Sequence, residues 1–256
     1  MLSVAQSGKY YVREFGTDNG IGYVNISVLG KNRGTVTDQS GRFNLDFGIV
    51  YDNDSLRFTM IGYEPVTITS GRLQETMVVF LHPKTYSLPE LHIAAPRGRE
   101  TILGTPVVSE SLKSGFSDNT LGAELGIKVY VKKRTRLSDI NFNIGTCSYD
   151  SVTYRLNIYR FSDKEEWENI LNTPIYLSFT KKQIKNTVTL DLKDYNLYVE
   201  GQLIFALELY RDPGEGKLLF LTQFFTGTTW HRQTASEIWT QSPGQVGIYL
   251  RGRQVR

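Results

Sequence analysis

Apolar and polar residues alternate along most of the segment from residue 20 to residue 93. Val24, Ile26 and Val28 are apolar, and Asn25 and Ser27 between them are polar. This is the period of a β-strand that buries one face. Turn residues interrupt the alternation about every ten residues, which is typical of β-sandwiches. Further strands are expected around Phe43 and Leu45; Leu56, Phe58 and Met60; Val66 and Ile68; and Met77–Leu81, with a turn at Ser70-Gly71.

The alternation resumes in the second half of the chain. It predicts a second, larger β-sandwich of the jelly-roll-like type, so the expected fold class is all-β. The apolar positions are Ile127, Val129 and Val131; Ile140, Phe142 and Ile144; Val152, Tyr154, Leu156 and Ile158; Val188, Leu190 and Leu192; and Leu203, Phe205, Leu207 and Leu209. One short helix is also expected, because Ser162 and Glu165 have the spacing of a capping box and Trp167, Ile170 and Leu171 would share one face.

A segment without apolar periodicity separates the two halves. Residues 94–100 read Ala-Ala-Pro-Arg-Gly-Arg-Glu, a composition typical of a linker. We therefore predict a first domain at residues 1–93, a linker at 94–103 and a second domain at 104–256. Ser3 and Ala5 have the spacing of a signal-peptidase site, so residues 1–5 are expected to be the remnant of a signal peptide.

The composition fits a globular protein rich in strands. Hydrophobic residues make up 40% of the 256 residues, and Tyr (15) and Phe (13) are abundant. The formal net charge of +3 is too small to indicate nucleic-acid binding. No apolar run is long enough to predict a transmembrane span.

Several motifs in the first half resemble the carboxypeptidase-regulatory-like, or transthyretin-like, domain. They are Tyr23-Val24-Asn25-Ile26, Gly34-Thr35-Val36-Thr37-Asp38 with Gly41 and Phe43, and Ile61-Gly62-Tyr63-Glu64. The second half resembles the segment that often follows this domain in envelope proteins of Gram-negative bacteria, through Gly122–Gly126, Lys132–Thr135 and Asp150–Val152. The resemblance implies a transthyretin-like sandwich and a location in the periplasm or at the cell surface, associated with the outer membrane.

The sequence gives no sign of catalytic chemistry, and we expect no enzyme activity, cofactor or metal. A zinc carboxypeptidase needs a His-x-x-Glu pair, but His82, His92 and His231 are followed three residues later by Thr, Ala and Thr. Cys147 is the only cysteine, and a buried or incidental thiol is expected. Glu208 lies in an apolar strand, where we expect it to face solvent or pair with Lys or Arg rather than act as a glycosidase acid.

Aspartates in the first half allow two interpretations. Asp38 precedes Gly41 in a predicted hairpin, where the carboxylate would bind backbone amides of its own turn and Gly41 would take a positive φ. The alternative is a calcium site built from Asp38, Asp52 and Asp54, although these residues lack a regular ligand spacing.

Two groups of residues are candidates for binding. The first is a basic cluster of Lys132, Lys133 and Arg134, which either protects a sheet edge or contacts an acidic partner. The second contains Trp230 and Trp239, which either pack in the core or stack on sugars.

These observations favour a non-catalytic interaction or structural subunit of an outer-membrane or periplasmic complex. The resemblance makes an outer-membrane β-barrel, or another envelope protein, the expected partner, because similar domains often precede transporters of that type. The alternative is a carbohydrate-binding module protein of the cell envelope, with a glycan as its ligand.

Overall fold

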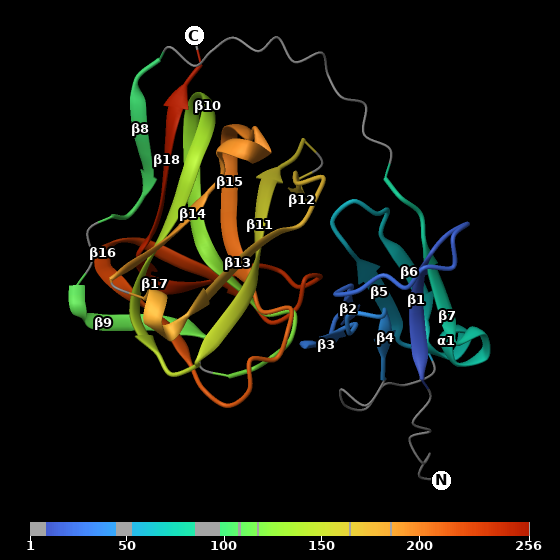
Figure 1. The fold of residues 1–256 in the computed structure, drawn as a ribbon. Coiled ribbons are helices and arrows are strands. Elements are labelled where there is room, and N and C mark those ends of the chain that lie inside the picture. The colour runs from blue at the N-terminus through green and yellow to red at the C-terminus, as the bar shows by residue number, and fades with distance from the viewer. Residues whose placement is uncertain are drawn as a thin grey trace.

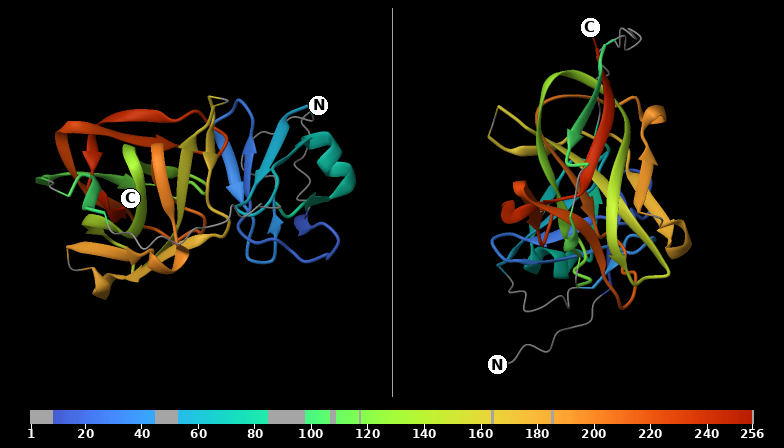
Figure 2. Two further views of the ribbon diagram at one scale, coloured as in Figure 1. Left: turned by 90° about the horizontal axis from the view of Figure 1, so that it is seen from above. Right: turned by 90° about the vertical axis from the view of Figure 1, so that its left-hand side faces the viewer.

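The computed structural model describes residues 9–44, 53–84, 98–106, 109–116, 118–163, 165–184 and 186–255. Strands account for 60% of the described residues and helices for 6%, which confirms the all-β prediction. The chain forms two β-units that lie side by side (Figures 1 and 2). No helix in the described residues is long and apolar enough to span a membrane.

The first unit is a small sandwich of two sheets around one apolar core. One sheet has the strand order β3-β2-β5-β6 and the other β4-β1-β7. Phe43, Leu56 and Phe58 are among the buried side chains of its core. The strands are β1 (Tyr10–Glu14), β2 (Asn25–Val28), β3 (Arg33–Val36), β4 (Arg42–Phe43), β5 (Ser55–Thr59), β6 (Val66–Thr69) and β7 (Val78–Leu81).

The hairpin around Asp38 has the predicted chemistry. The Asp38 carboxylate accepts hydrogen bonds from the backbone N–H groups of Ser40 (2.8 Å) and Arg42 (2.9 Å). Gly41 has φ 80°, and a Cβ at this position would lie 2.4 Å from the Val12 carbonyl oxygen, so no larger residue fits. The turn predicted at Ser70-Gly71 is wrong, because α1 (Ser70–Thr76) begins there with Thr69 as its N-cap. α1 lies on the side of the first unit that faces away from the second (Figure 2).

The second unit is built around one very long strand, β10 (Glu124–Cys147). The first part of β10 pairs with β15, its two ends pair with β16, and its middle part pairs with β14 and β18. The other strands are β8 (Glu100–Gly104), β9 (Ser109–Phe116), β11 (Ser151–Phe161), β12 (Trp167–Asn169), β13 (Ile175–Thr180), β14 (Thr187–Asp191), β15 (Tyr198–Glu208), β16 (Leu218–Arg232), β17 (Thr240–Val246) and β18 (Ile248–Gln254), with 3₁₀ turns at Lys181–Gln183 and Lys193–Tyr195. β10 thus links strands that enclose a large apolar core.

The helix predicted near residues 162–171 is wrong. Residues 167–169 form β12, which pairs with β11 through Phe161 opposite Trp167. The Ser162 N–H donates to the Glu166 carbonyl and the Glu165 N–H to the Ser162 carbonyl, which makes a hairpin turn. Pairing with the edge of β11 therefore outweighs the local capping signal.

Part of the segment predicted as a linker belongs to the sheet of the second unit. Gly98 N–H donates to the Gln254 carbonyl and Gln254 N–H to the Arg99 carbonyl. β8 then pairs with β18 from residue 100 onwards. Residues 94–97 and the predicted signal remnant at residues 1–5 lie outside the described residues.

The polar side chains of β2 are buried, although the alternation predicted only one buried face for this strand. Ile26 and Val28 lie in the core of the first unit as predicted, yet the intervening Asn25 and Ser27 are only 6% and 1% exposed. β2 and β3 lie next to the second unit (Figure 1). The polar face of β2 is therefore part of an interface.

Candidate functional site

Four charged residues form a continuous line across the sheet of the second unit. Glu124 of β10 lies opposite Glu208 of β15 on one side and opposite Arg232 of β16 on the other. Arg155 of β11 lies opposite Glu208. Residues opposite each other on antiparallel strands point to the same face, so Arg155, Glu208, Glu124 and Arg232 are neighbours in that order. We call them the charged row.

The Glu208 carboxylate accepts four hydrogen bonds. Arg155 binds it through both Nε (2.8 Å) and Nη2 (2.6 Å). The Asn157 amide donates to Oε2 and the Asn25 amide to Oε1, each at 2.7 Å. Glu208 is fully buried, so these donors replace all of its contact with water. The prediction that Glu208 pairs with Lys or Arg is confirmed, whereas the alternative of a solvent-facing side chain is wrong.

Glu124 is bonded almost as completely. Its Oε1 accepts from Arg232 Nη2 (2.7 Å), Arg232 Nε (3.2 Å) and the Tyr159 hydroxyl (3.0 Å). Its Oε2 accepts from the Asn157 amide at 3.3 Å, so Asn157 links the two carboxylates. The Arg232 guanidinium also lies 4.8 Å from the centre of the Tyr159 ring and 4.4 Å from that of Trp239.

The electrostatics of the charged row follow from burial and from these pairs. Burial raises the pKa of Glu124, Arg232 opposes the rise, and the Glu208 carboxylate adds to it. Burial opposes the charge of Arg155, but the Glu208 carboxylate outweighs this and raises the pKa of the guanidinium. Burial and then the Glu124 carboxylate raise the pKa of Tyr159 well above its ordinary value, so its hydroxyl remains a donor.

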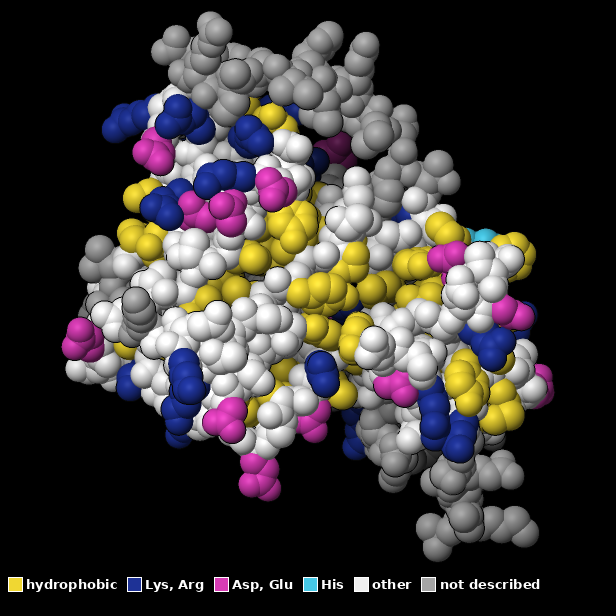
Figure 3. Space-filling model, in the orientation of Figure 1, with side chains coloured by type: hydrophobic (Ala, Val, Ile, Leu, Met, Phe, Trp, Pro, Cys, Tyr) yellow, Lys and Arg dark blue, Asp and Glu magenta, His cyan; other side chains and the backbone are white. Residues whose placement is uncertain are grey.

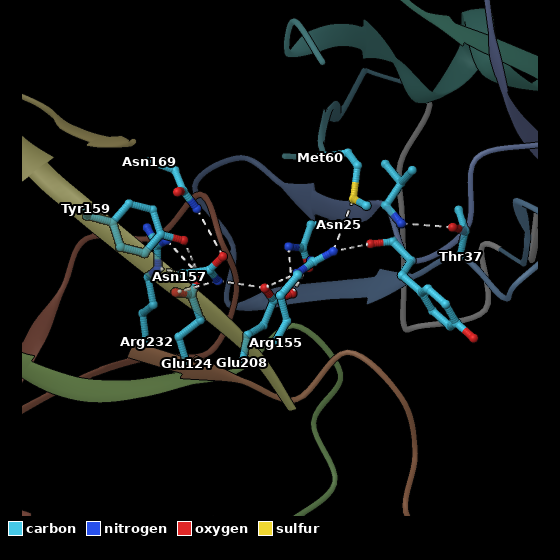
Figure 4. Close-up of polar contacts among 12 residues, drawn as sticks. Asn25, Thr37, Met60, Glu124, Arg155, Asn157, Tyr159, Asn169, Glu208 and Arg232 are labelled. Atoms are coloured by element: carbon cyan, nitrogen blue, oxygen red, sulfur yellow. Dashed lines mark hydrogen bonds and ion pairs between the residues drawn. The ribbon is translucent and has the colours of Figure 1, made fainter. Parts of the chain in front are cut away.

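The charged row also binds the first unit. Arg155 Nη1 donates to the Tyr23 carbonyl at 2.8 Å and lies 3.1 Å from the Met60 sulfur. Figure 4 shows the contact of Arg155 with Met60 together with the bond from Asn25 to Glu208. Tyr23 has φ 63°, the left-handed region that a bulky residue rarely adopts, and its ring packs edge-on against Tyr210 at 4.8 Å. Tyr23 of the first unit therefore accepts the hydrogen bond of the Arg155 guanidinium while its own backbone is in an unusual conformation.

A cleft of about 860 Å³ lies above the charged row, between the two units. Met60, Tyr63 and Glu64 line it from the first unit, and three tryptophans line it from the second: Trp167, Trp230 and Trp239. Hydrophobic side chains gather on the surface where the two units meet, on the face shown in Figure 3. The volume is in the range of ligand pockets in other proteins.

One loop beside the cleft has unsatisfied polar groups. Among the described residues, seven buried side-chain N or O atoms have no hydrogen-bond partner, and four of them belong to Thr234, Ser236, Glu237 and Trp239. The last three of these residues line the cleft. We call residues 234–239 the 234–239 loop.

The structure separates the residues that the sequence proposed for binding. Trp239 is 7% exposed and packs on Tyr159, Ile204 and Ala206, so it belongs to an apolar cluster and also lines the cleft. Trp230 is half-buried beside that cluster, with the Lys128 ammonium 4.8 Å from its ring centre.

The basic cluster lies elsewhere. Lys132, Lys133 and Arg134 are exposed and are not among the described residues that line the cleft. They occupy the point where the pairing of β10 with β15 shifts register, between Val131 and Thr135. The Arg134 guanidinium lies 5.0 Å from the centre of the Tyr198 ring.

The remaining candidates have local partners. No group of three or more His, Cys, Asp or Glu among the described residues is placed to hold a metal ion. Asp54 pairs with Lys31 at 2.7 Å, and Asp52 lies outside the described residues. Cys147 is partly buried, and burial raises the pKa of its thiol.

Most of the charged row was missed in the sequence, although a signal was present. Arg155 and Glu208 stand inside long apolar strands, between Tyr154 and Leu156 and between Leu207 and Leu209. A charged residue in such a strand requires a partner if both faces of the sheet are covered. The sequence does not indicate that this face of the sheet is covered, so a charged partner was predicted for Glu208 alone.

Residues 9–93 match the family model of the CarboxypepD_reg-like domain. This segment of the chain is a CarboxypepD_reg-like domain. The match contains the seven strands described in the first unit and confirms the resemblance inferred from the sequence motifs. No curated protein sequence matches the chain. The CarboxypepD_reg-like domain therefore supplies Tyr23, Asn25 and Met60 to the interface, and the second unit supplies the charged row.

Proposed function

We propose that this chain is a non-catalytic interaction subunit of a bacterial outer-membrane or periplasmic complex, and that it docks on an outer-membrane β-barrel protein. The non-catalytic part of this proposal is supported by the hydrogen bonding of the two buried glutamates, Glu208 and Glu124. Glu208 accepts four hydrogen bonds and Glu124 also accepts four. A carboxylate has about four lone-pair sites, so Glu208 has none free for a substrate. Glu124 is enclosed by its partners, with three donors on Oε1 and Asn157 on Oε2 at 3.3 Å.

The same bonds support a scaffolding role. Arg155 and Glu208 contact three residues of the CarboxypepD_reg-like domain: Tyr23, Asn25 and Met60. In some proteins a buried charge pair with well-aligned partners adds little stability and instead fixes geometry, and we propose that role for Arg155 and Glu208. The two units then present their outer loops and strand edges in a fixed arrangement, as a docking subunit requires.

The basic cluster is the proposed contact with the partner. Lys132 and Lys133 are exposed at an irregularity of β10, and such irregularities commonly redirect side chains for a function. An interaction through exposed lysines weakens as the salt concentration rises. The dependence of binding on salt concentration is therefore a measurable test of the proposal.

The test is fractionation of the native protein from the cell envelope, followed by identification of the proteins that co-purify with it. We expect the chain to sediment with membranes together with a β-barrel protein, and Lys132→Glu/Lys133→Glu to reduce the sedimenting fraction most at low salt. Lys181→Glu/Lys182→Glu is the matched control, because these two lysines are also exposed and adjacent but lie on another part of the second unit. A chain that stays in the free fraction at low salt would contradict the proposal.

A further inference from the structure

We infer that the chain binds the surface of an anionic lipid bilayer through a patch of aromatic, aliphatic and basic side chains on the second unit. The inference deepens the proposed function and rests on its placement of the chain at a membrane. All the apolar members of this surface are exposed or half-buried. We call them the apolar patch: Tyr130, Phe161, Trp167, Trp230 and Ile238.

Strand pairing places two members of the apolar patch on the face of the sheet that carries the charged row. Lys128 of β10 lies opposite Ile204 of β15, which lies opposite Tyr159 of β11. Tyr130 and Phe161 are each two residues further along β10 and β11, so they point to the same face as Lys128 and Tyr159. Residue 124 of the charged row precedes Lys128 by an even number of positions in this part of β10, so the face is the same.

The aromatic rings of the apolar patch lie next to one another and to a lysine. Phe161 lies opposite Trp167 with ring centres 5.1 Å apart, and the ring centres of Trp167 and Trp230 are 6.3 Å apart. The Lys128 ammonium lies 4.8 Å from the centre of the Trp230 ring. Indole rings beside a lysine are typical of the bilayer interface, where the rings lie among the head groups and the ammonium reaches the phosphates. Such a contact needs no free ring face, so Lys128 does not obstruct it.

Two members of the apolar patch project far into solvent. Ile238 is 89% exposed and Tyr130 is 65% exposed. Ile238 belongs to the 234–239 loop and lines the same cleft as Trp167 and Trp230, so it extends the apolar patch. These two side chains bury little surface in the isolated chain, whereas beneath the head groups of a bilayer their apolar surface leaves water.

Positive charge borders the apolar patch at one end. The basic cluster, Lys132–Arg134, begins two residues after Tyr130 on β10 and is exposed. Glu200 of β15 is exposed opposite this cluster, between the paired residues at positions 131 and 135 of β10, so an excess of positive charge remains. Glu165 and Glu166 lie at the other end, in the turn between β11 and β12. We therefore expect the end with the basic cluster to approach an anionic bilayer most closely.

The experiment is co-sedimentation of the full chain with lipid vesicles that contain no protein. Vesicles of phosphatidylcholine and phosphatidylglycerol in equal parts supply the anionic surface, and vesicles of phosphatidylcholine alone are the neutral comparison. We expect the partition coefficient at low salt to be about tenfold or more higher for the anionic vesicles, and to fall as the salt concentration rises.

Variants locate the contact. Ile238→Ser and Tyr130→Ser should each lower the partition coefficient by about tenfold, since removing a large apolar side chain from water contributes that much. Lys132→Glu/Lys133→Glu should lower it by more than about tenfold, because two attractive charges become repulsive. Unchanged urea unfolding of these variants would show that the losses are not losses of folding.

Two control variants match these changes elsewhere on the second unit. Ile102→Ser removes an isoleucine that is 54% exposed on β8, away from β12 (Figure 1), and it should leave the partition coefficient unchanged. Lys181→Glu/Lys182→Glu alters the net charge as much as the change at Lys132 and Lys133, and it should lower the partition coefficient by less than about threefold.

Three results would overturn the inference. They are the absence of sedimentation with anionic vesicles at low salt, equal binding to both kinds of vesicle, and binding that Ile238→Ser and Tyr130→Ser leave intact. A chain that sediments with native membranes but not with protein-free vesicles would overturn the lipid contact and leave the proposed docking on a protein standing. Vesicle binding without a co-purifying β-barrel protein would have the opposite meaning, so the inference and the proposed function can fail separately.

Discussion

The charged row and the 234–239 loop both bury polar groups beside the same cleft, yet they differ in how those groups are bonded. Both glutamates of the row are bonded through all of their carboxylate oxygens. In the loop, Ser236, Glu237 and Trp239 each have a buried polar atom without a partner among the described residues. Burial alone therefore does not separate these two groups of residues, whereas the completeness of their hydrogen bonding does.

The largest effect is expected from breaking the charged row. Glu208→Leu would leave the Arg155 charge buried without its carboxylate, so we expect a loss of about 3–5 kcal/mol in the free energy of unfolding. The measurement is urea unfolding at neutral pH. The double variant Arg155→Met/Glu208→Leu removes both charges and should recover about 2 kcal/mol of the loss. A cost below about 1 kcal/mol for the single variant would mean that the pair does not support the fold.

A smaller loss of stability is expected when the neutral side chain that bridges the two carboxylates of the charged row, Asn157, is removed. Asn157→Ala removes the amide that donates to both Glu124 and Glu208. Two buried acceptors would then lose a donor, which should cost about 1–3 kcal/mol. The exposed Asn32 is the control, and Asn32→Ala should change the free energy of unfolding by less than about 0.5 kcal/mol. Equal effects of the two changes would contradict the account.

Tyr63 lines the cleft and has a hydrogen-bond partner. A substitution there tests whether its bond stabilises the fold, as the bonds of the charged row do. Its hydroxyl donates to Glu14 at 2.7 Å, and burial followed by this bond raises the pKa of Tyr63 to about 12 from 10.0. Because the folded-state pKa is raised, the bond stabilises the fold fully below pH 10, and the stabilisation is lost as the pH rises through 12. Tyr63→Phe should cost about 0.5 kcal/mol at neutral pH, and the difference from the native chain should shrink above pH 10. Urea unfolding across this pH range is the measurement, and a difference that grows above pH 10 would contradict the assignment.

The smallest effect is expected in the 234–239 loop. The Ser236 hydroxyl has no hydrogen-bond partner among the described residues, so Ser236→Ala removes no bond. The free energy of unfolding should change by less than about 0.5 kcal/mol. A loss greater than about 1 kcal/mol in urea unfolding would place Ser236 with the scaffold.

The sequence predicted the strands of the CarboxypepD_reg-like domain well, because period-two alternation and turn residues are local signals. The hairpin of Asp38 and Gly41 was predicted for the same reason. The helix expected after Ser162 was not found, since pairing of β12 with β11 depends on a neighbour that a capping box does not report.

The site depends on contacts between distant parts of the chain. Asn25 and Glu208 are 183 residues apart, and Glu124 and Arg232 are 108 residues apart. The polar half of β2 has the pattern of a solvent-exposed face, and it is buried only because the second unit covers it. A local pattern cannot report such a cover, so the sequence indicated a Lys or Arg partner for Glu208 but neither the other members of the charged row nor the cleft.

The charged row joins the CarboxypepD_reg-like domain to the second unit. A double-mutant cycle between Asn25→Ala and Glu208→Leu, measured by urea unfolding, tests this contact directly, because the two residues meet only across the interface at 2.7 Å. The cost of the unpaired Arg155 is present in both variants that lack Glu208 and cancels in the cycle. We expect a coupling free energy of about 1–2 kcal/mol between the two changes. Additivity of the two changes within about 0.3 kcal/mol would contradict it.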